Sequence, residues 1–158
     1  MTEQQIRNKE LVEKYPFLLP RHWKTDEVDV DYDYTWTELD DMPDGWRNAF
    51  GEQMCNEILH CLEKADYVDQ YRILQIKEKY GGLRWYDSGA PDSIYDELDS
   101  IIEKYTTMSE RTCVVCGKPA TVMSLGWICP YCDDCAKGVK DRFKKIEFED
   151  ITIEDNSV

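Results

Sequence analysis

The sequence predicts an α+β fold in which a small domain of helices and an antiparallel β-hairpin precedes a cysteine-rich finger. Three patterns lead to this prediction: apolar residues at helical spacing, two strand-like runs separated by glycines, and two Cys-x2-Cys pairs near the C-terminus. We expect an acidic α+β domain over residues 1–110, a finger over 111–146 and an acidic tail over 147–158.

Three helices account for most of the predicted core. The first covers residues 3–15, where a few apolar residues stand in a polar background and Pro16 ends the pattern. The second follows Pro43 and carries apolar residues at every fourth position: Trp46, Phe50, Met54, Ile58 and Leu62. The third runs from about residue 92 to 107 with a similar stripe: Ile94, Leu98, Ile101, Ile102 and Tyr105. Such stripes are typical of helices that pack on a common core.

A β-hairpin is predicted between the second and third helices. Two strand-like runs flank a turn at Gly81-Gly82. Because side chains alternate along a strand, Leu74 and Ile76 would share one face, and Leu83 and Trp85 would share one face of the partner strand.

Residues 26–44 carry nine carboxylates and no lysine or arginine. Between residues 28 and 37 apolar and polar side chains alternate, which predicts an amphipathic strand with an acidic outer face. The carboxylates that we consider candidates for partner binding are Asp29, Asp31, Asp33, Glu38, Asp40, Asp41 and Asp44.

Three interpretations of the acidic strand remain open. It can be an edge strand whose charges discourage aggregation. It can be a calcium loop starting at Asp29, although Tyr34 stands where that loop needs glycine and Asp40 stands where it needs a bidentate glutamate. It can also be a recognition surface for a basic partner, since carboxylates two residues apart on a strand are spaced by roughly 6.6 Å, close to the spacing of backbone phosphates.

The two Cys-x2-Cys pairs predict one structural Zn²⁺ site, with Cys113, Cys116, Cys132 and Cys135 as ligands. A short hairpin is expected over residues 121–128, and a helix is expected from Asp133 to Ile146. A knuckle, a hairpin and a helix whose first turn carries the last ligands follow the order of a treble-clef finger. Cys129 and Cys132 form a further Cys-x2-Cys pair, but we favour Cys132 and Cys135 because a thiolate is stabilised in the first turn of a helix.

Net charge and cysteine content narrow the class of protein. The formal net charge of −14 repels nucleic acid and favours basic partners. The polar start of the chain does not look like a signal peptide, and no apolar run approaches the roughly 18 residues of a membrane span. Seven cysteines, four of them spaced as metal ligands, favour a reducing compartment. We therefore expect a cytoplasmic protein.

The helix predicted after the last two cysteines is basic. Over residues 136–146 its charged side chains carry a net charge of +4: Lys137, Lys140, Arg142, Lys144 and Lys145 against Asp141. Such a helix can contact phosphates. It can equally neutralise the acidic face of the protein or the last carbonyl groups of the helix itself.

Three motifs in one order resemble a family of small acidic phage and prophage proteins that end in a four-cysteine zinc finger. They are TELDDMPDGW at 37–46, QIKEKYGGLRWY at 75–86 and MSERTCVVCG at 108–117, and the likeness covers about residues 15–137. Mobile elements often encode inhibitors of host defence, including inhibitors of CRISPR nucleases and restriction enzymes. The resemblance therefore implies an anti-defence protein in the host cell cytosol, and it implies no particular catalytic residue.

No catalytic group is evident in the sequence. His22 and His60 have no apparent partner, and a four-cysteine site leaves no open metal position for a substrate. We expect a non-enzymatic binding protein without a small-molecule substrate. It would inhibit a host nucleic-acid-processing or defence complex, for example a CRISPR nuclease, through an acidic surface that mimics nucleic acid. The alternative is a nucleic-acid-binding accessory protein of phage transcription or replication that uses the basic helix 137–145.

Overall fold

The computed structural model of the chain describes residues 1–147. The elements before the finger are α1 (Glu3–Lys14), α2 (Asp44–Trp46), α3 (Glu52–Glu63), β1 (Ile73–Lys79), β2 (Gly82–Asp87) and α4 (Asp92–Ser109). The finger contains β3 (Val122–Ser124), β4 (Pro130–Tyr131), α5 (Asp133–Ala136) and β5 (Phe143–Lys145). Helices and two small antiparallel sheets confirm the predicted α+β class.

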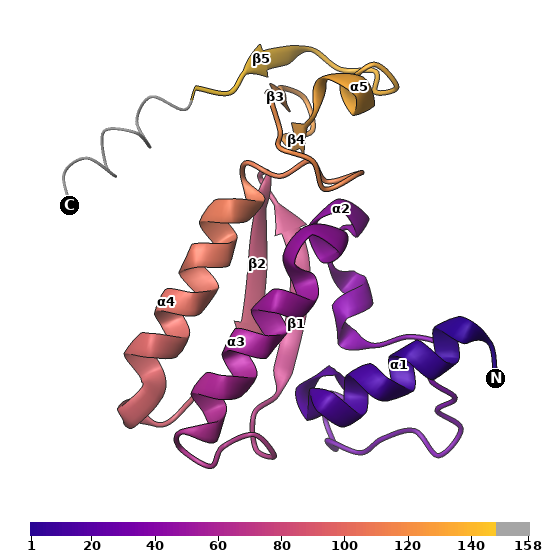
Figure 1. The fold of residues 1–158 in the computed structure, drawn as a ribbon, viewed down its shortest axis with the longest axis vertical. Helices are drawn as coiled ribbons and strands as arrows, with labels where there is room; N and C mark the ends of the chain where they lie inside the picture. The colour runs from indigo at the N-terminus through magenta and orange to yellow at the C-terminus, as the bar shows by residue number, and fades with distance from the viewer. Residues whose placement is uncertain (148–158) are drawn as a thin grey trace.

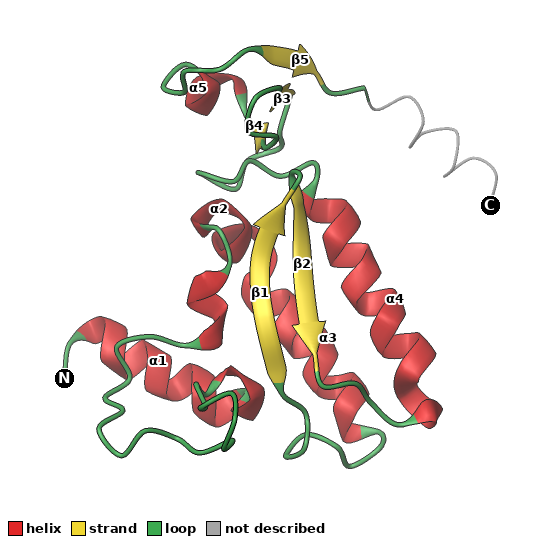
Figure 2. Ribbon diagram, turned by 180° about the vertical axis from the view of Figure 1, so that it is seen from behind, coloured by secondary structure: helices red, strands yellow, loops and turns green. Residues whose placement is uncertain are grey.

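Helices α3 and α4 lie side by side against one face of the β1–β2 hairpin, as the two opposite views show (Figures 1 and 2). The finger lies at the end of the body where the tip of the hairpin and α2 meet (Figure 1). The buried side chains before the finger form one hydrophobic cluster, whose largest members are Tyr15, Phe17, Trp46, Phe50, Tyr71, Trp85 and Tyr105.

Both ends of α1 follow from its sequence. Thr2 and Gln5 form a capping box at the start, and the helix ends before Pro16, which confirms the predicted helix. Gln5 and the buried Asn8 of α1 hold the segment after Tyr32 by two hydrogen bonds to backbone carbonyl oxygens. Gln5 Nε2 donates to Asp33 O at 3.0 Å and Asn8 Nδ2 donates to Tyr34 O at 2.9 Å.

The second predicted helix is present with a π-helical turn (Arg47–Gly51) between α2 and α3. Its predicted stripe is buried in full: Trp46, Phe50, Met54, Ile58 and Leu62. The third predicted helix is confirmed as α4, which buries Ile94, Leu98 and Tyr105. The i, i+4 stripe was therefore sufficient to locate both long helices.

The hairpin is confirmed, and its turn lies at Tyr80-Gly81, where the φ angles are +54° and +82°. Two consecutive residues with positive φ are typical of the type I′ turn that matches the twist of the strands. Leu83 and Trp85 share the buried face as expected. Leu74 does not share the buried face with Ile76, because a bulge between Ile73 and Gln75 shifts the register, and Leu74 is 67% exposed.

The amphipathic strand predicted over residues 28–37 is wrong. The segment is a loop without strand pairing, and Val30 on its supposed inner face is 97% exposed. Alternation of side chains produces a strand only where a neighbouring strand pairs with it. Here Asp26 and Tyr34 have φ angles of +59° and +64°, and Asp31 N donates to Asp29 Oδ1 in a local turn.

The finger is built around a three-stranded sheet in the order β4-β3-β5. The predicted hairpin is present, but its second strand is Pro130–Tyr131 and lies beyond residues 127–128. The helix predicted from Asp133 to Ile146 is reduced to the single turn of α5, and the basic helix 137–145 is therefore wrong. Residues 143–145 pair with β3 instead, and the Phe143 ring packs edge-on against Tyr131, so tertiary contacts override the helical spacing.

Two further expectations concern the ends and surface of the chain. The acidic tail predicted over 147–158 lies, from residue 148 onward, outside the described residues. Within residues 1–147 no helix has the length and apolar character needed to cross a membrane.

Candidate metal centre

Four cysteine side chains converge at the base of the finger. The sulfur atoms of Cys113, Cys116, Cys132 and Cys135 all lie within 4.8 Å of one another. Over the described part of the chain, this is the one group of three or more potential metal ligands that gathers in this way. The predicted ligand set is therefore brought together.

Two different local structures aim the sulfur atoms at one point. The first pair belongs to a knuckle over residues 113–117, in which Gly117 N donates to Cys113 O at 3.1 Å and Gly117 has a φ of +82°. The second pair belongs to the start of α5, where the Cys132 sulfur caps the turn by accepting from Cys135 N at 3.4 Å. The predicted position of the last pair, in the first turn of a helix, is confirmed even though the helix is short.

The spacing of the sulfur atoms fits a tetrahedral metal ion. With metal–sulfur bonds of about 2.3 Å, neighbouring sulfur atoms of a tetrahedral zinc site are roughly 3.8 Å apart. The Cys116 and Cys132 sulfur atoms lie 3.6 Å apart. Four sulfur ligands would fill the coordination of such an ion, so the arrangement suits a structural role better than a catalytic one.

The site also favours ionised sulfur at Cys113. Burial opposes ionisation of this thiol, but backbone N–H groups of Cys116, Cys132 and Val115 donate toward the sulfur, and together they bring the pKa of Cys113 to about 7. A thiolate is the form of cysteine that binds a metal ion.

Cys129 stays outside the cluster. Its side chain is buried in the loop between β3 and β4, where Cys129 N donates to Ser124 Oγ at 2.9 Å. Burial, reinforced by the nearby Glu78 carboxylate, raises the pKa of Cys129 to about 12. Because its sulfur does not join the group of four, the geometry agrees with the choice of Cys132 and Cys135 as the second pair.

The knuckle is packed directly on the start of α2. Gly45 N donates to Val114 O at 2.8 Å, and Trp46 Nε1 donates to Thr112 O at 2.8 Å. A Cβ atom built on Gly45 would stand 2.1 Å from Cys113 O, so the two backbones approach as closely as only glycine permits. Sequence reasoning missed this contact, and the one signal for it was a glycine in the first turn of a predicted helix.

The seven predicted partner-binding carboxylates do not form one uniform row. Asp29, Asp31 and Asp33 are exposed in the loop, and within residues 1–147 none of them forms an ion pair. Asp40 and Asp44 are paired with Arg47 at 3.1 and 2.8 Å. Arg47 lies outside the acidic stretch in sequence and was not part of the prediction.

The remaining two carboxylates belong to a short 3₁₀ helix over Glu38–Asp41. Asp41 is exposed, whereas Glu38 is partly covered. Burial, with a smaller contribution from the charge of Asp41, raises the pKa of Glu38 to about 7. Three of the seven predicted carboxylates are therefore paired or partly protonated at neutral pH, and most of the free negative charge lies at residues 29–33. The three aspartates of the hypothetical calcium loop do not converge on a common point.

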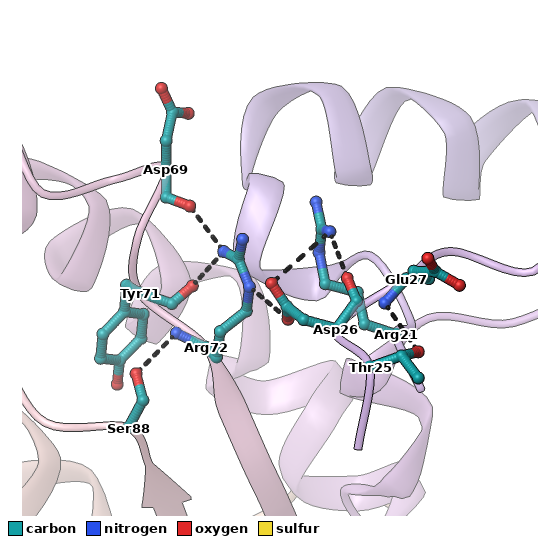
Figure 3. A network of polar contacts seen from close by, with 8 residues as sticks. All are labelled: Arg21, Thr25, Asp26, Glu27, Asp69, Tyr71, Arg72 and Ser88. Carbon is teal, nitrogen blue, oxygen red and sulfur yellow. Dashed lines mark hydrogen bonds and ion pairs between the residues drawn. The ribbon is translucent and has the colours of Figure 1, made fainter. Parts of the chain in front are cut away.

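Asp26, at the start of the acidic segment, is held by a network of polar contacts to Arg21 and to Arg72, which immediately precedes β1 (Figure 3). Arg72 Nε donates to Asp26 Oδ1 at 2.8 Å, and Arg21 Nη1 donates to Asp26 O at 2.8 Å. The hydrogen bond from Arg72 lowers the pKa of Asp26. The other donor groups of Arg72 reach the carbonyl oxygens of Asp69 and Tyr71. The loop therefore leaves the body of the protein from a fixed point.

Comparison with known proteins does not identify the metal centre, so its assignment rests on the geometry of the four cysteines. No protein-family model matches the chain, and neither the curated proteins nor the solved structures contain a match.

Proposed function

We propose that the four cysteines hold one structural Zn²⁺ ion and that the chain is a non-enzymatic binding protein. The zinc assignment is supported by four sulfur atoms that lie within 4.8 Å of one another, with one pair at 3.6 Å. The order of knuckle, β3–β4 hairpin and α5 turn supports a treble-clef-like finger, with the helix reduced to one turn.

The proposed function is recognition of a basic protein partner by the acidic loop, which we define as residues 26–37. The single observation that carries it is the exposure of Asp29, Asp31 and Asp33 on a loop that is fixed at its base. Exposed charges without internal partners steer association with a surface of opposite charge. The resemblance described above points to a nucleic-acid-processing or defence complex of a host cell, such as a CRISPR nuclease, as the partner that the loop would inhibit by occupying a nucleic-acid-binding groove.

Capture of host proteins by the purified protein tests this proposal. The triple variant Asp29→Lys/Asp31→Lys/Asp33→Lys should lose the captured partner, and capture by the unchanged protein should weaken steeply between low and high salt. A matched control is Asp92→Lys/Asp96→Lys/Asp99→Lys, which reverses the same number of exposed charges on α4. Capture that survives reversal of the loop charges, or that is lost equally in the control, would exclude the acidic loop as the binding surface.

The zinc assignment has a separate test. Elemental analysis of the purified protein should find one zinc per chain, and Cys116→Ala should abolish it. Cys129→Ala should keep the metal, because Cys129 lies outside the cluster. Purified protein that folds without bound metal would exclude this part of the proposal.

A second candidate function is nucleic-acid binding by the basic segment of the finger. It is favoured by the exposure of four basic side chains after α5: Lys140, Arg142, Lys144 and Lys145. They would contact phosphates from a loop and the edge strand β5, since the basic helix does not form. Binding to single- or double-stranded nucleic acid that disappears in Lys140→Glu/Arg142→Glu would favour this candidate over the acidic loop.

A further inference from the structure

Two adjoining hollows lie beside the acidic loop. The larger has a volume of about 610 Å³ and is lined by residues of the loop, including Asp29, Asp31, Asp33 and Trp36. The smaller, of about 190 Å³, is lined by Trp23 and Leu74 among others. Arg21 and His22 line both, so the two hollows are neighbours on the surface.

The smaller hollow is lined by two exposed apolar side chains that do not pack in the hydrophobic core. Trp23 is 83% exposed although Lys24 and His22 contact its ring. Leu74 is turned outward by the bulge in β1 and stands in the same hollow. Bulges that redirect a side chain toward solvent recur at binding sites, and a large exposed apolar area marks an interaction surface more often than a single exposed residue does.

The charge around the two hollows is strongly negative. Their linings contain two arginines and six carboxylates: Arg21, Arg72, Asp26, Glu27, Asp29, Asp31, Asp33 and Glu38. Both arginines are already engaged by Asp26. The field that remains would attract cations and repel phosphates, which makes a nucleic acid the wrong occupant.

The surface is also fixed before any partner binds. Arg72 and Arg21 hold the loop at Asp26, and α1 holds it at the carbonyl oxygens of Asp33 and Tyr34. Thr35 Oγ1 donates to Asp33 Oδ1 at 2.8 Å, which orients that carboxylate. A surface that is ordered in the free protein loses less entropy when it binds.

We propose that the two hollows form one docking groove for a cationic protein segment that carries a large apolar side chain. The apolar side chain occupies the hollow lined by Trp23 and Leu74, while its neighbouring lysines or arginines face Asp29, Asp31 and Asp33. This inference rests on the proposed function, because the groove adjoins the same loop. It adds that charge alone does not select the partner.

Two labelled peptides of equal charge test the groove: lysines flanking a central leucine, and the same peptide with a central alanine. Fluorescence anisotropy at low salt should show the leucine peptide binding about tenfold more tightly, as burial of a leucine side chain predicts. Trp23→Ser/Leu74→Ser should remove this preference. Both side chains are exposed, so the variant should fold normally. Leu125→Ser changes an exposed leucine of the finger and should leave the preference intact.

Variants that neutralise the loop aspartates provide a second test in the same assay. Asp29→Asn/Asp31→Asn/Asp33→Asn should weaken both peptides by a similar factor and leave the preference for leucine in place. Equal affinity for the two peptides, no binding of either, or a preference that persists in Trp23→Ser/Leu74→Ser would overturn the groove. The proposed function would survive those results if capture of a host partner still depended on the loop aspartates, so the two failures are distinguishable.

Discussion

Trp46 and Thr112 are joined by a hydrogen bond of 2.8 Å, in which the indole Nε1 donates to a carbonyl oxygen 66 positions later in the chain. The accepting residue lies immediately before Cys113, the first candidate ligand. Together with the hydrogen bond from Gly45 N to Val114 O, it joins the start of the long helical segment to the candidate metal centre. The stability of the helical body and that of the finger should therefore depend on each other.

Trp46→Phe should destabilise the protein by about 1–3 kcal/mol, because it leaves a buried carbonyl oxygen without its donor. Urea unfolding followed by circular dichroism measures this loss. Trp36→Phe is the matched control, since Trp36 is partly exposed and its substitution should change stability by less than about 0.5 kcal/mol. Equal effects of the two substitutions would mean that the hydrogen bond contributes nothing.

Gly45→Ala should be more damaging than a glycine substitution elsewhere. Its Cβ would overlap Cys113 O, so either α2 or the knuckle must move, at a cost of about 3 kcal/mol or more. Gly138→Ala is the control, because its Cβ would meet only Cys135 O at an ordinary 3.7 Å. Thermal unfolding of both variants checks the difference, and similar melting temperatures would contradict the close approach.

Metal removal should increase hydrogen exchange at residues outside the finger. Chelation should increase hydrogen exchange at the backbone N–H of Gly45 and at the indole N–H of Trp46, because both donate to carbonyl groups of the knuckle segment. The middle of α3, for example the amide of Ile58, should remain better protected. Exchange that rises in the finger alone would show that the two parts are energetically independent.

Glu38 should make stability depend on pH in an unusual direction for a carboxyl group. Its pKa is about 7 in the folded protein against 4.5 for a solvent-exposed glutamate, so the native state binds the extra proton between these values. The free energy of unfolding should therefore fall as pH rises through this window. Glu38→Gln should flatten the profile and stabilise the protein above pH 7 by about 1–2 kcal/mol, allowing for partial exposure of the group.

Asp41→Asn gives an internal control for the pH effect. Removing that charge should lower the pKa of Glu38 without uncovering its carboxyl group, so the fall in stability should end at a lower pH and be smaller in total. Chemical denaturation at a series of pH values measures both profiles. A Glu38→Gln profile that coincides with that of the unchanged protein would contradict the assigned pKa shift.

Local patterns predicted the parts of the fold that local forces determine. The stripe from Trp46 to Leu62 and the Tyr80-Gly81 turn each specify their own conformation, and the four clustered cysteines were predicted from their spacing alone. The strand predicted for the acidic segment was wrong because no neighbouring strand pairs with its alternating apolar and polar residues. The long helix predicted after Asp133 was wrong because residues 143–145 pair with β3 as strand β5, although the apolar residues there are spaced as in a helix.

Contacts between distant residues were beyond sequence reasoning. Nothing in the spacing of the acidic stretch indicated that Arg47 would neutralise Asp40 and Asp44. The close approach of Gly45 to Cys113 likewise depends on two segments that meet only in the folded chain. The bulge that exposes Leu74 could not be foreseen either, because the sequence of the strand shows an ordinary alternating pattern at that position.

The hydrogen bond between Trp46 and Thr112 also has a consequence for synthesis on the ribosome. At roughly 5–20 residues per second, Trp46 would be translated about 3–13 s before its acceptor, Thr112. During that interval the indole of Trp46, which is fully buried in the folded protein, has no acceptor from residue 112. Slow codons between these two positions would lengthen the delay and lower the yield of correctly assembled protein.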